Sequence, residues 1–339
     1  MGIWNRRAVL VTGGASFIGS HLVDKLVELG ADVRVVDDLS SGRRANLDRH
    51  SSGGRVEFVQ ADLRQSEAAA AAVRDVDVAF HLAAIHGGRG FIDRHQADCS
   101  QNLIIDGNLF RAACEAQLDK VVYASSGCVY PVNLQMDVGQ EVYLSEEAVG
   151  PPYEADDSYG WAKLMGELSL RAYHNDYGLR SAACRLFTVY GERCTENHAL
   201  IAMIGRAFLR QDPFEVWGDG SQVRNWTHVD DIVSGFILAA EKIDDASAVN
   251  LGTEERIRVI DAVREILRHT GHEAEIALLT HMPTGPLNRV ASNRRAAELL
   301  GWRPQISFRD GLHRTIEWYY STKDPDQLRN GFKALLLDR

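Results

Sequence analysis

Residues 8–38 read AVLVTGGASFIGSHLVDKLVELGADVRVVDD, and they set the architecture of the whole chain. The first five are apolar and rich in β-branched side chains, which predicts a buried parallel strand. A glycine-rich turn follows, and apolar residues then recur at helical spacing until Gly30, a typical C-terminal cap. Residues 33–36 predict a second strand, which ends in Asp37-Asp38. This order of strand, turn, helix, strand and acid is typical of a dinucleotide-binding unit.

The turn also indicates which residues contact the dinucleotide. Glycines let backbone approach a pyrophosphate at a helix N-terminus, and the acid meets a ribose hydroxyl. Ser16 stands where a middle glycine is usual, and we expect this small side chain to be tolerated. Because no arginine directly follows Asp37, the cofactor is expected to be NAD rather than NADP. The unit contributes Gly13, Ser16, Phe17, Ile18, Gly19 and Asp37 to the expected cofactor site.

Further strands alternate with helices, which predicts an α/β fold with a doubly wound parallel sheet, the Rossmann arrangement. The strand at 56–59 leads to Asp62, which is expected to meet the adenine, and the strand at 76–84 ends in small residues that permit close cofactor approach. His81 is interpreted as a structural strand-end histidine. The glycine-rich loop at 85–91 lies where a substrate would be held. These segments add Asp62, Leu63, Leu82, Ala83 and Ala84 to the cofactor site, and Gly88 and Arg89 to the substrate site.

Composition narrows the function classes. The chain has 339 residues and a net charge of −10, which argues against nucleic acid as the main partner. No run is long and apolar enough for a membrane span, and the N-terminus lacks the apolar core of a signal peptide. The five cysteines form no C-x-x-C pair, so a reducing cytoplasm is expected, and no metal site is predicted.

A tyrosine and a lysine form the candidate reaction centre. Tyr159 and Lys163 are four residues apart, which places them on one face of a helix. An ammonium beside a phenol favours the phenolate, so Lys163 is expected to lower the pKa of Tyr159. Upstream, the strand at 120–126 delivers Ser126 and Cys128 to the same edge of the sheet.

The second half of the chain predicts a smaller C-terminal α/β substrate domain. We expect residues 1–190, with about 225–255, to form the NAD-binding domain. Residues 191–224 and 256–330 are expected to form a sugar-nucleotide-binding domain. The two domains interleave along the chain, which predicts a cleft between them.

Several motifs together resemble the extended short-chain dehydrogenase/reductase family that modifies nucleotide sugars. They are Gly13-Gly14-x-x-Phe17-Ile18-Gly19, Ser125-Ser126, Tyr159-x-x-x-Lys163, Arg185-x-Phe187-x-Val189-Tyr190-Gly191 and Trp217-Gly218-Asp219-Gly220. The resemblance covers residues 8 to about 320. It implies bound NAD, transient oxidation of the sugar at C4, and a homodimer.

Within that family the chain most resembles the GDP-mannose 3,5-epimerases, through residues 83–92, 125–131 and 217–224. The resemblance implies that Tyr159 takes the C4 hydroxyl proton while Ser126 binds the same oxygen. Cys128 would then exchange a proton at C5, and at C3 if both centres are inverted. These epimerases carry a lysine where His198 aligns here, and imidazole can also serve as an acid or base.

The resemblance also nominates residues for a GDP-mannose-like nucleotide sugar. Thr188 stands where the family usually has asparagine, which leaves the identity of the substrate open. Two alternatives stay open as well: a 4-epimerase of the UDP-glucose or UDP-glucuronate type, and another dehydratase or decarboxylase of nucleotide sugars. The expected substrate residues are Gly88, Arg89, Ser126, Thr188, Asn197, Arg206, Trp217, Gln222, Arg224 and Arg289.

Overall fold

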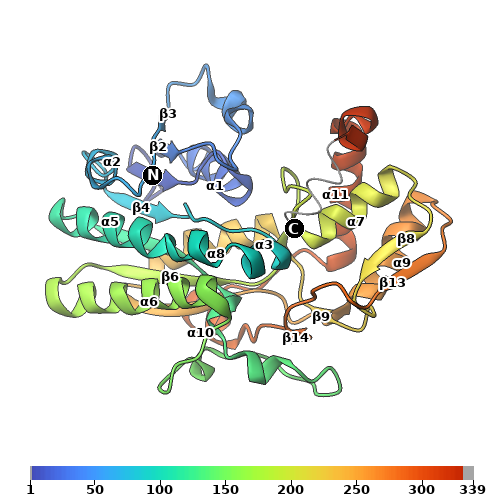
Figure 1. Cartoon of the computed structure of the whole chain (residues 1–339). Coiled ribbons are helices and arrows are strands. Elements are labelled where there is room, and N and C mark those ends of the chain that lie inside the picture. The colour runs from blue at the N-terminus through green and yellow to red at the C-terminus, as the bar shows by residue number, and fades with distance from the viewer. Residues whose placement is uncertain (1, 331–339) are drawn as a thin grey trace.

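Residues 2–330 are described by a computed structural model, in which seven parallel strands form one central sheet (Figure 1). Neighbours β1 and β4 mark the point where the strand order reverses, so the sheet is doubly wound, as predicted. In spatial order the strands are β11 (Asp245–Leu251), β6 (Ser181–Leu186), β5 (Lys120–Ser126), β4 (Val78–His81), β1 (Ala8–Thr12), β2 (Asp32–Asp37) and β3 (Val56–Gln60).

Both faces of the sheet are covered by helices, which explains why its central strands β1 and β4 are mostly apolar and buried. Successive residues of β1 point to opposite faces, so Val9 and Val11 belong to one apolar core and Leu10 to the other. The first core is closed by α1 (Phe17–Glu28), α8 (Val229–Lys242) and α10 (Arg294–Leu300). The second is closed by α2 (Ser66–Ala72), α5 (Asn102–Glu115) and α6 (Asp157–Tyr177).

A smaller lobe lies beside the sheet and has its own apolar core (Figure 1). Its helices are α7 (Ala199–Phe208), α9 (Val259–Thr270) and α11 (Phe308–Thr322). Strand β8 (Phe214–Trp217) pairs in parallel with β13 (Ile276–Leu279). Strand β9 (Val223–Arg224) lies between β12 (Ile257–Arg258) and β14 (Asn288–Arg289). Strands β7 (Val189–Tyr190) and β10 (Thr227–His228) pair where the chain passes between the lobes.

Short helices complete the described chain. Helices α3 (Arg89–Arg94) and α4 (Gln96–Ser100) precede α5. The 3-10 helices are η1 (Arg44–His50), η2 (Gly127–Val129), η3 (Val132–Gln135) and η4 (Glu146–Ala148). Within residues 2–330 no helix combines the length and the apolar character that a membrane crossing needs.

One segment of the expected substrate domain packs on the large sheet. Ala296 and Leu300 of α10, together with Trp302, are buried in the same core as α1 and α8. The Trp302 indole N–H donates to the carbonyl oxygen of Asp231 in α8, at 3.1 Å. The chain therefore returns to the large sheet after building most of the small lobe. The proposed domain boundaries stay a prediction.

Candidate active site

A single cleft runs along the carboxyl ends of the sheet strands and continues between the two lobes. In open α/β sheets ligands bind at this edge, beside the point where the strand order reverses. The glycine turn after β1 and the ends of β2, β4, β5 and β6 line one part of the cleft, and β8, β9 and β14 line the other. The cleft therefore has room for a cofactor on the sheet and a second ligand toward the small lobe.

The glycine turn is packed too closely to carry side chains. Gly13 has φ +68°, and a Cβ there would lie 3.0 Å from the backbone nitrogen of Ala83. A Cβ at Gly19 would collide with the carbonyl oxygen of Gly13. Ser16 and Phe17 at the N-terminus of α1 line the cleft beside this turn. The backbone N–H groups of a helix N-terminus suit a pyrophosphate, so the turn fits a dinucleotide.

Asp37 lies at the end of β2, in the wall of the same cleft. Its carboxylate accepts hydrogen bonds from the backbone N–H of Ala15 at 3.0 Å and of Leu39 at 2.9 Å. Burial raises the pKa of Asp37, although the two N–H groups oppose that rise. The side chain is thereby held in one orientation at the ribose position that the sequence predicts.

Tyr159, Ser126 and Lys163 lie together at the centre of the cleft. The Ser126 hydroxyl is hydrogen bonded to the Tyr159 phenol, and Lys163 is only 2% exposed. Burial raises the pKa of Tyr159, nearby Cys128 raises it further, and burial lowers the pKa of Lys163. This corrects the expectation of a lowered pKa for Tyr159: burial of the phenol is the largest cause, and it raises that pKa.

Behind the lysine lies a buried polar network. The Thr12 hydroxyl accepts from the N–H groups of Leu82 and Ala83, so its own proton goes to Nδ1 of His81, at 2.8 Å. His81 Nε2 must then carry the other proton, which it donates to Asp106 at 3.0 Å. Both ring nitrogens of His81 are satisfied within the protein, in agreement with its structural interpretation.

Cys128 lies beside Tyr159 and is held by contacts at both ends. Its carbonyl oxygen accepts from the N–H of Asp156 at 2.8 Å, and a Cβ at Gly160 would collide with that oxygen. Its sulfur accepts from Nη1 of Arg289 at 3.2 Å. The small Gly160 thus lets helix α6 approach Cys128, and the sulfur faces a guanidinium.

The Asp156 carboxylate joins two arginines in the cleft wall. Arg289 Nη2 donates to Oδ2 at 2.8 Å, and Arg89 Nη1 donates to Oδ1 at 2.7 Å. Arg89 also pairs with Asp157 and Asp93. Asp156 occupies the N-cap of α6, where the sequence predicts a capping side chain, but its carboxylate forms no cap hydrogen bond.

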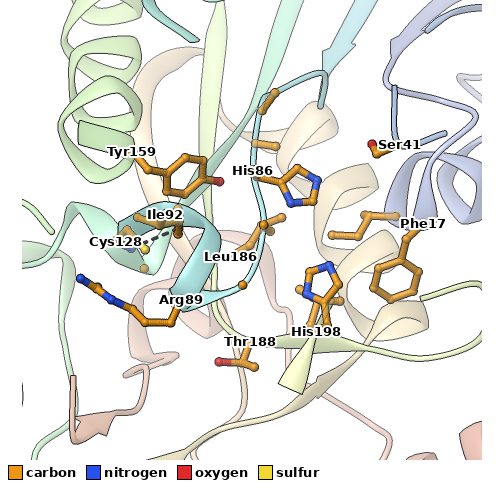
Figure 2. Close-up of a pocket in the computed structure, with 18 of the residues that line it drawn as sticks. Phe17, Ser41, His86, Arg89, Ile92, Cys128, Tyr159, Leu186, Thr188 and His198 are labelled. Carbon is orange, nitrogen blue, oxygen red and sulfur yellow. Dashed lines mark hydrogen bonds between the residues drawn. The ribbon is translucent and has the colours of Figure 1, made fainter. Parts of the chain in front are cut away.

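Two histidines face each other across the cleft from Tyr159 and Cys128 (Figure 2). The ring centroids of His86 and His198 are 5.9 Å apart. The ring of Phe17 packs against His198, with 6.4 Å between their ring centroids. Burial, with a smaller contribution from Lys163, lowers the pKa of His86 to about 4. His86 is therefore neutral near pH 7.

Arg224 lies at the small-lobe end of the cleft, next to Arg289 on the neighbouring strand. Its guanidinium donates to the carbonyl oxygens of Val223 at 2.8 Å and of Thr284 at 2.9 Å. Burial, together with the charge of Arg289, lowers the pKa of Arg224 to about 9. A bound anion would relieve that repulsion, so this end suits a phosphate.

Known proteins resemble the chain along most of its length. Residues 9–252 match the family model described as the NAD dependent epimerase/dehydratase family. The chain belongs to this family. A UDP-glucose 4-epimerase of Mycolicibacterium smegmatis is 33% identical, over 91% of this chain and 97% of that protein. GDP-mannose 3,5-epimerase 1 of Oryza sativa subsp. indica is 31% identical, over 91% of this chain and 81% of that protein.

A solved structure of the family confirms the fold. The dTDP-glucose 4,6-dehydratase DesIV of Streptomyces venezuelae, crystallised with NAD bound, superposes with a TM-score of 0.83 at 30% identity. The match covers 93% of this chain and 97% of that chain. Family membership and this likeness establish NAD as the cofactor.

The cleft brings together most of the residues that the sequence predicts for an epimerase/dehydratase. Every predicted catalytic and cofactor residue lines it, among them Leu63, Leu82 and Ala84. Asn197 and Arg206 do not line it. Asn197 accepts a hydrogen bond from the Thr195 hydroxyl at 2.5 Å, and Arg206 is 1% exposed within the small lobe. Burial lowers the pKa of Arg206 to about 10.

The sequence interpretation missed two residues of the cleft. One is Asp156, whose pairing with two arginines distant in the sequence leaves no local pattern. His86 lay in a loop that was read for its glycines alone. Its position one residue before Gly87-Gly88 was the one available signal.

Proposed function

We propose that this protein is an NAD-dependent nucleotide-sugar epimerase that oxidises C4 and then exchanges a proton at C5, and possibly at C3, of a GDP-mannose-like substrate. The observation that carries the proposal is the presence of Cys128 and His198 on opposite sides of the cleft that contains Tyr159 (Figure 2). Inversion of a carbon centre by proton exchange needs one group on each face of the sugar ring.

Oxidation at C4 is the first step. The glycine turn, Asp37 and Ala83 would hold NAD, which would accept the hydride that leaves C4 and return it after the proton exchange. Tyr159 takes the hydroxyl proton of C4, and Ser126, hydrogen bonded to the phenol, steadies the same oxygen. Only the phenolate of Tyr159 can take this proton. Because burial raises the pKa of Tyr159, the step requires the charged Lys163 ammonium beside it to favour the phenolate.

Proton exchange at C5 is the second step. A ketone at C4 acidifies the neighbouring C–H bonds, since the carbanion delocalises into an enolate. Cys128 removes the proton from one face as an S–H bond forms, and His198 delivers a proton to the other face as the ketone re-forms. Gly127 and Cys128 stand where 4,6-dehydratases of the family commonly carry an Asp-Glu pair, which argues against dehydration.

The nucleotide is assigned to the small-lobe end of the cleft. Arg224 supplies charge for the diphosphate, and Trp217 offers an aromatic face for the base. Gln222 has a donor and an acceptor for the nucleotide. Gly88, Arg89 and Thr188 also line the cleft and are assigned to the sugar.

A 4-epimerase is the second candidate function. The similarity to the UDP-glucose 4-epimerase of M. smegmatis favours it as strongly as the rice enzyme favours proton exchange. Tyr159, Ser126 and Lys163 would suffice for it, because C4 is inverted by oxidation and re-reduction alone. Cys128 and His198 would then have no chemical step to perform.

Hydrogen exchange with solvent separates the two functions. The full chain is incubated with NAD and a panel of GDP- and UDP-sugars in deuterated water, and products are analysed by mass spectrometry and NMR. Deuterium at C5, or at C3 and C5, is the expected result. Product inverted at C4 with no deuterium at either carbon would replace the first proposal with the second.

We also propose a homodimer in a reducing compartment, the cytoplasm. Helices α5 and α6 pack side by side and expose Leu103, Ile104, Trp161 and Met165, between 42% and 51%. Exposed apolar faces of this kind commonly become buried between subunits. All five cysteines are free. Light scattering of wild-type protein and of Trp161→Glu tests the dimer, which the glutamate should weaken.

A further inference from the structure

The Arg289 guanidinium is committed to groups of the protein itself. Nε donates to Oε1 of the buried Gln135 at 2.6 Å, Nη2 to Asp156 at 2.8 Å and Nη1 to the Cys128 sulfur at 3.2 Å. Three of the five N–H groups of an arginine are thereby used before any ligand enters. Of these acceptors, only the sulfur reacts in the proposed function.

Contacts on each side orient the sulfur toward that guanidinium. The Cys128 N–H donates to the Ser126 hydroxyl at 3.1 Å, and its carbonyl oxygen accepts from Asp156. Asp156 therefore holds Cys128 twice, through the backbone and through Arg289. Burial alone would lower the pKa of Arg289, but Cys128 and Asp156 outweigh it and raise that pKa.

We propose that Arg289 is a positioning residue that keeps Cys128 in the thiolate form, which makes Cys128 the base and His198 the acid of the C5 exchange. A guanidinium hydrogen bonded to a partly exposed cysteine favours the thiolate. The direction of proton flow rests on the proposed function. The hydrogen bond between Arg289 and the Cys128 sulfur does not, because it exists before substrate binds. In this proposal Arg289 supports proton transfer by Cys128, in addition to the nucleotide contact that the resemblance implies.

Other charged and titratable groups also face Cys128. Tyr159 and Cys99 are neutral at neutral pH, since burial raises the pKa of both. The anion Asp156 opposes the thiolate, but it is shared by two arginines. The remaining neighbour is Arg224, which adds a second positive charge.

Alkylation of the resting enzyme tests this assignment without substrate. Iodoacetamide is pulsed onto the full chain across a pH series, and each cysteine is quantified by mass spectrometry. The thiolate sulfur attacks the methylene carbon, the C–S bond forms and iodide leaves. Cys128 should reach half of its maximal rate at a lower pH than a free thiol, N-acetylcysteine, alkylated in the same buffers. Cys114, which is half-buried and whose pKa is raised by burial, should react only at higher pH.

Substitution of the guanidinium gives the second comparison. In Arg289→Gln, alkylation of Cys128 at neutral pH should slow at least about tenfold and its profile should move to higher pH. Arg289→Lys keeps the positive charge but loses the planar guanidinium. Its rate of Cys128 alkylation should lie between those of wild type and Arg289→Gln. Arg256→Gln is the matched control: Arg256 donates to Asn288 on the same strand at 3.1 Å but lies outside the cleft lining, so Cys128 should react as in wild type.

Two results overturn the proposal. One is a wild-type profile in which Cys128 reacts at no lower pH than free N-acetylcysteine, which decides the matter even if the variants fail to fold. The other is a folded Arg289→Gln protein that reacts as fast as wild type. Failure of deuterium to enter C5 would instead overturn the proposed function and leave these profiles unchanged.

Discussion

The Lys163 ammonium lies 4.7 Å from the centre of the Tyr123 ring and 6.0 Å from the centre of the Tyr159 ring. The Tyr123 hydroxyl in turn donates to Asp106 at 2.5 Å. The buried ammonium is thus stabilised by an aromatic face and by a carboxylate behind it.

This arrangement predicts a pH effect of Asp106→Asn. Burial lowers the pKa of Lys163 and Asp106 raises it, so removal of the carboxylate charge should lower that pKa further. Because turnover needs the charged ammonium, its loss on the alkaline side should begin about one pH unit earlier. Turnover is followed across pH for wild type and variant. Tyr123→Phe, which keeps the carboxylate, should show a smaller shift. An unchanged alkaline limb in Asp106→Asn would show that the carboxylate does not support Lys163.

Loss of the phenol should stop chemistry at C4 without loss of the cofactor. Tyr159→Phe keeps the ring and removes the hydroxyl that is hydrogen bonded to Ser126. We expect the rate of NADH formation in a single turnover to fall roughly 10²–10⁴-fold. NAD affinity, measured by calorimetry, should stay near that of wild type. A variant that still reduces NAD at the wild-type rate would remove Tyr159 from the mechanism.

Substitution of Cys128 or of His198 should separate oxidation at C4 from proton transfer at C5. Cys128→Ser and His198→Ala should each abolish inversion at C5, because one face of the ring loses its acid or base. Transient NADH formation should remain measurable in both, since Tyr159 and Lys163 are intact. Stopped-flow absorbance follows NADH, and NMR of the product follows the configuration at C5. Wild-type inversion in both variants would exclude these residues.

Gly13 in the glycine turn and Gly54, which lies just before β3, offer a matched pair of alanine substitutions. Gly54 has φ +66° with open space around it, so Gly54→Ala should cost only the backbone strain, about 1 kcal/mol. Gly13 has φ +68° and would also press its Cβ on Ala83, so Gly13→Ala should cost about 2–3 kcal/mol. Denaturant unfolding compares the two, and NAD titration should show weaker binding only for Gly13→Ala. Equal losses in both would mean that close packing at Gly13 contributes nothing.

Features carried by neighbouring residues were predictable from the sequence. The order of Gly13, Gly19 and Asp37 along one strand–helix–strand unit predicts both the parallel sheet and the position of NAD, because each signal depends on local backbone geometry. The pairing of Tyr159 with Lys163 was predictable for the same reason, because their spacing alone places them on one face of a helix.

Features that depend on tertiary burial were not predictable. The pKa of Tyr159 rises because the folded cleft removes water from the phenol, and no spacing of residues expresses that. Asp156 binds Arg89 and Arg289, which are 67 and 133 residues away in the sequence. No local sequence pattern therefore indicates these contacts. Arg206 was nominated for its charge and its place in a motif, yet α7 directs it away from the cleft lining.

The return of the chain to the large sheet has a consequence for the exchange of lobes. Strand β11, helix α8 and helix α10 complete the NAD-binding half, yet each follows a segment that builds the small lobe. A single cut between residues 191 and 294 would leave both halves without part of their cores. Neither half is one contiguous segment of the chain, so transplanting the small lobe onto another large sheet would require the exchange of more than one segment.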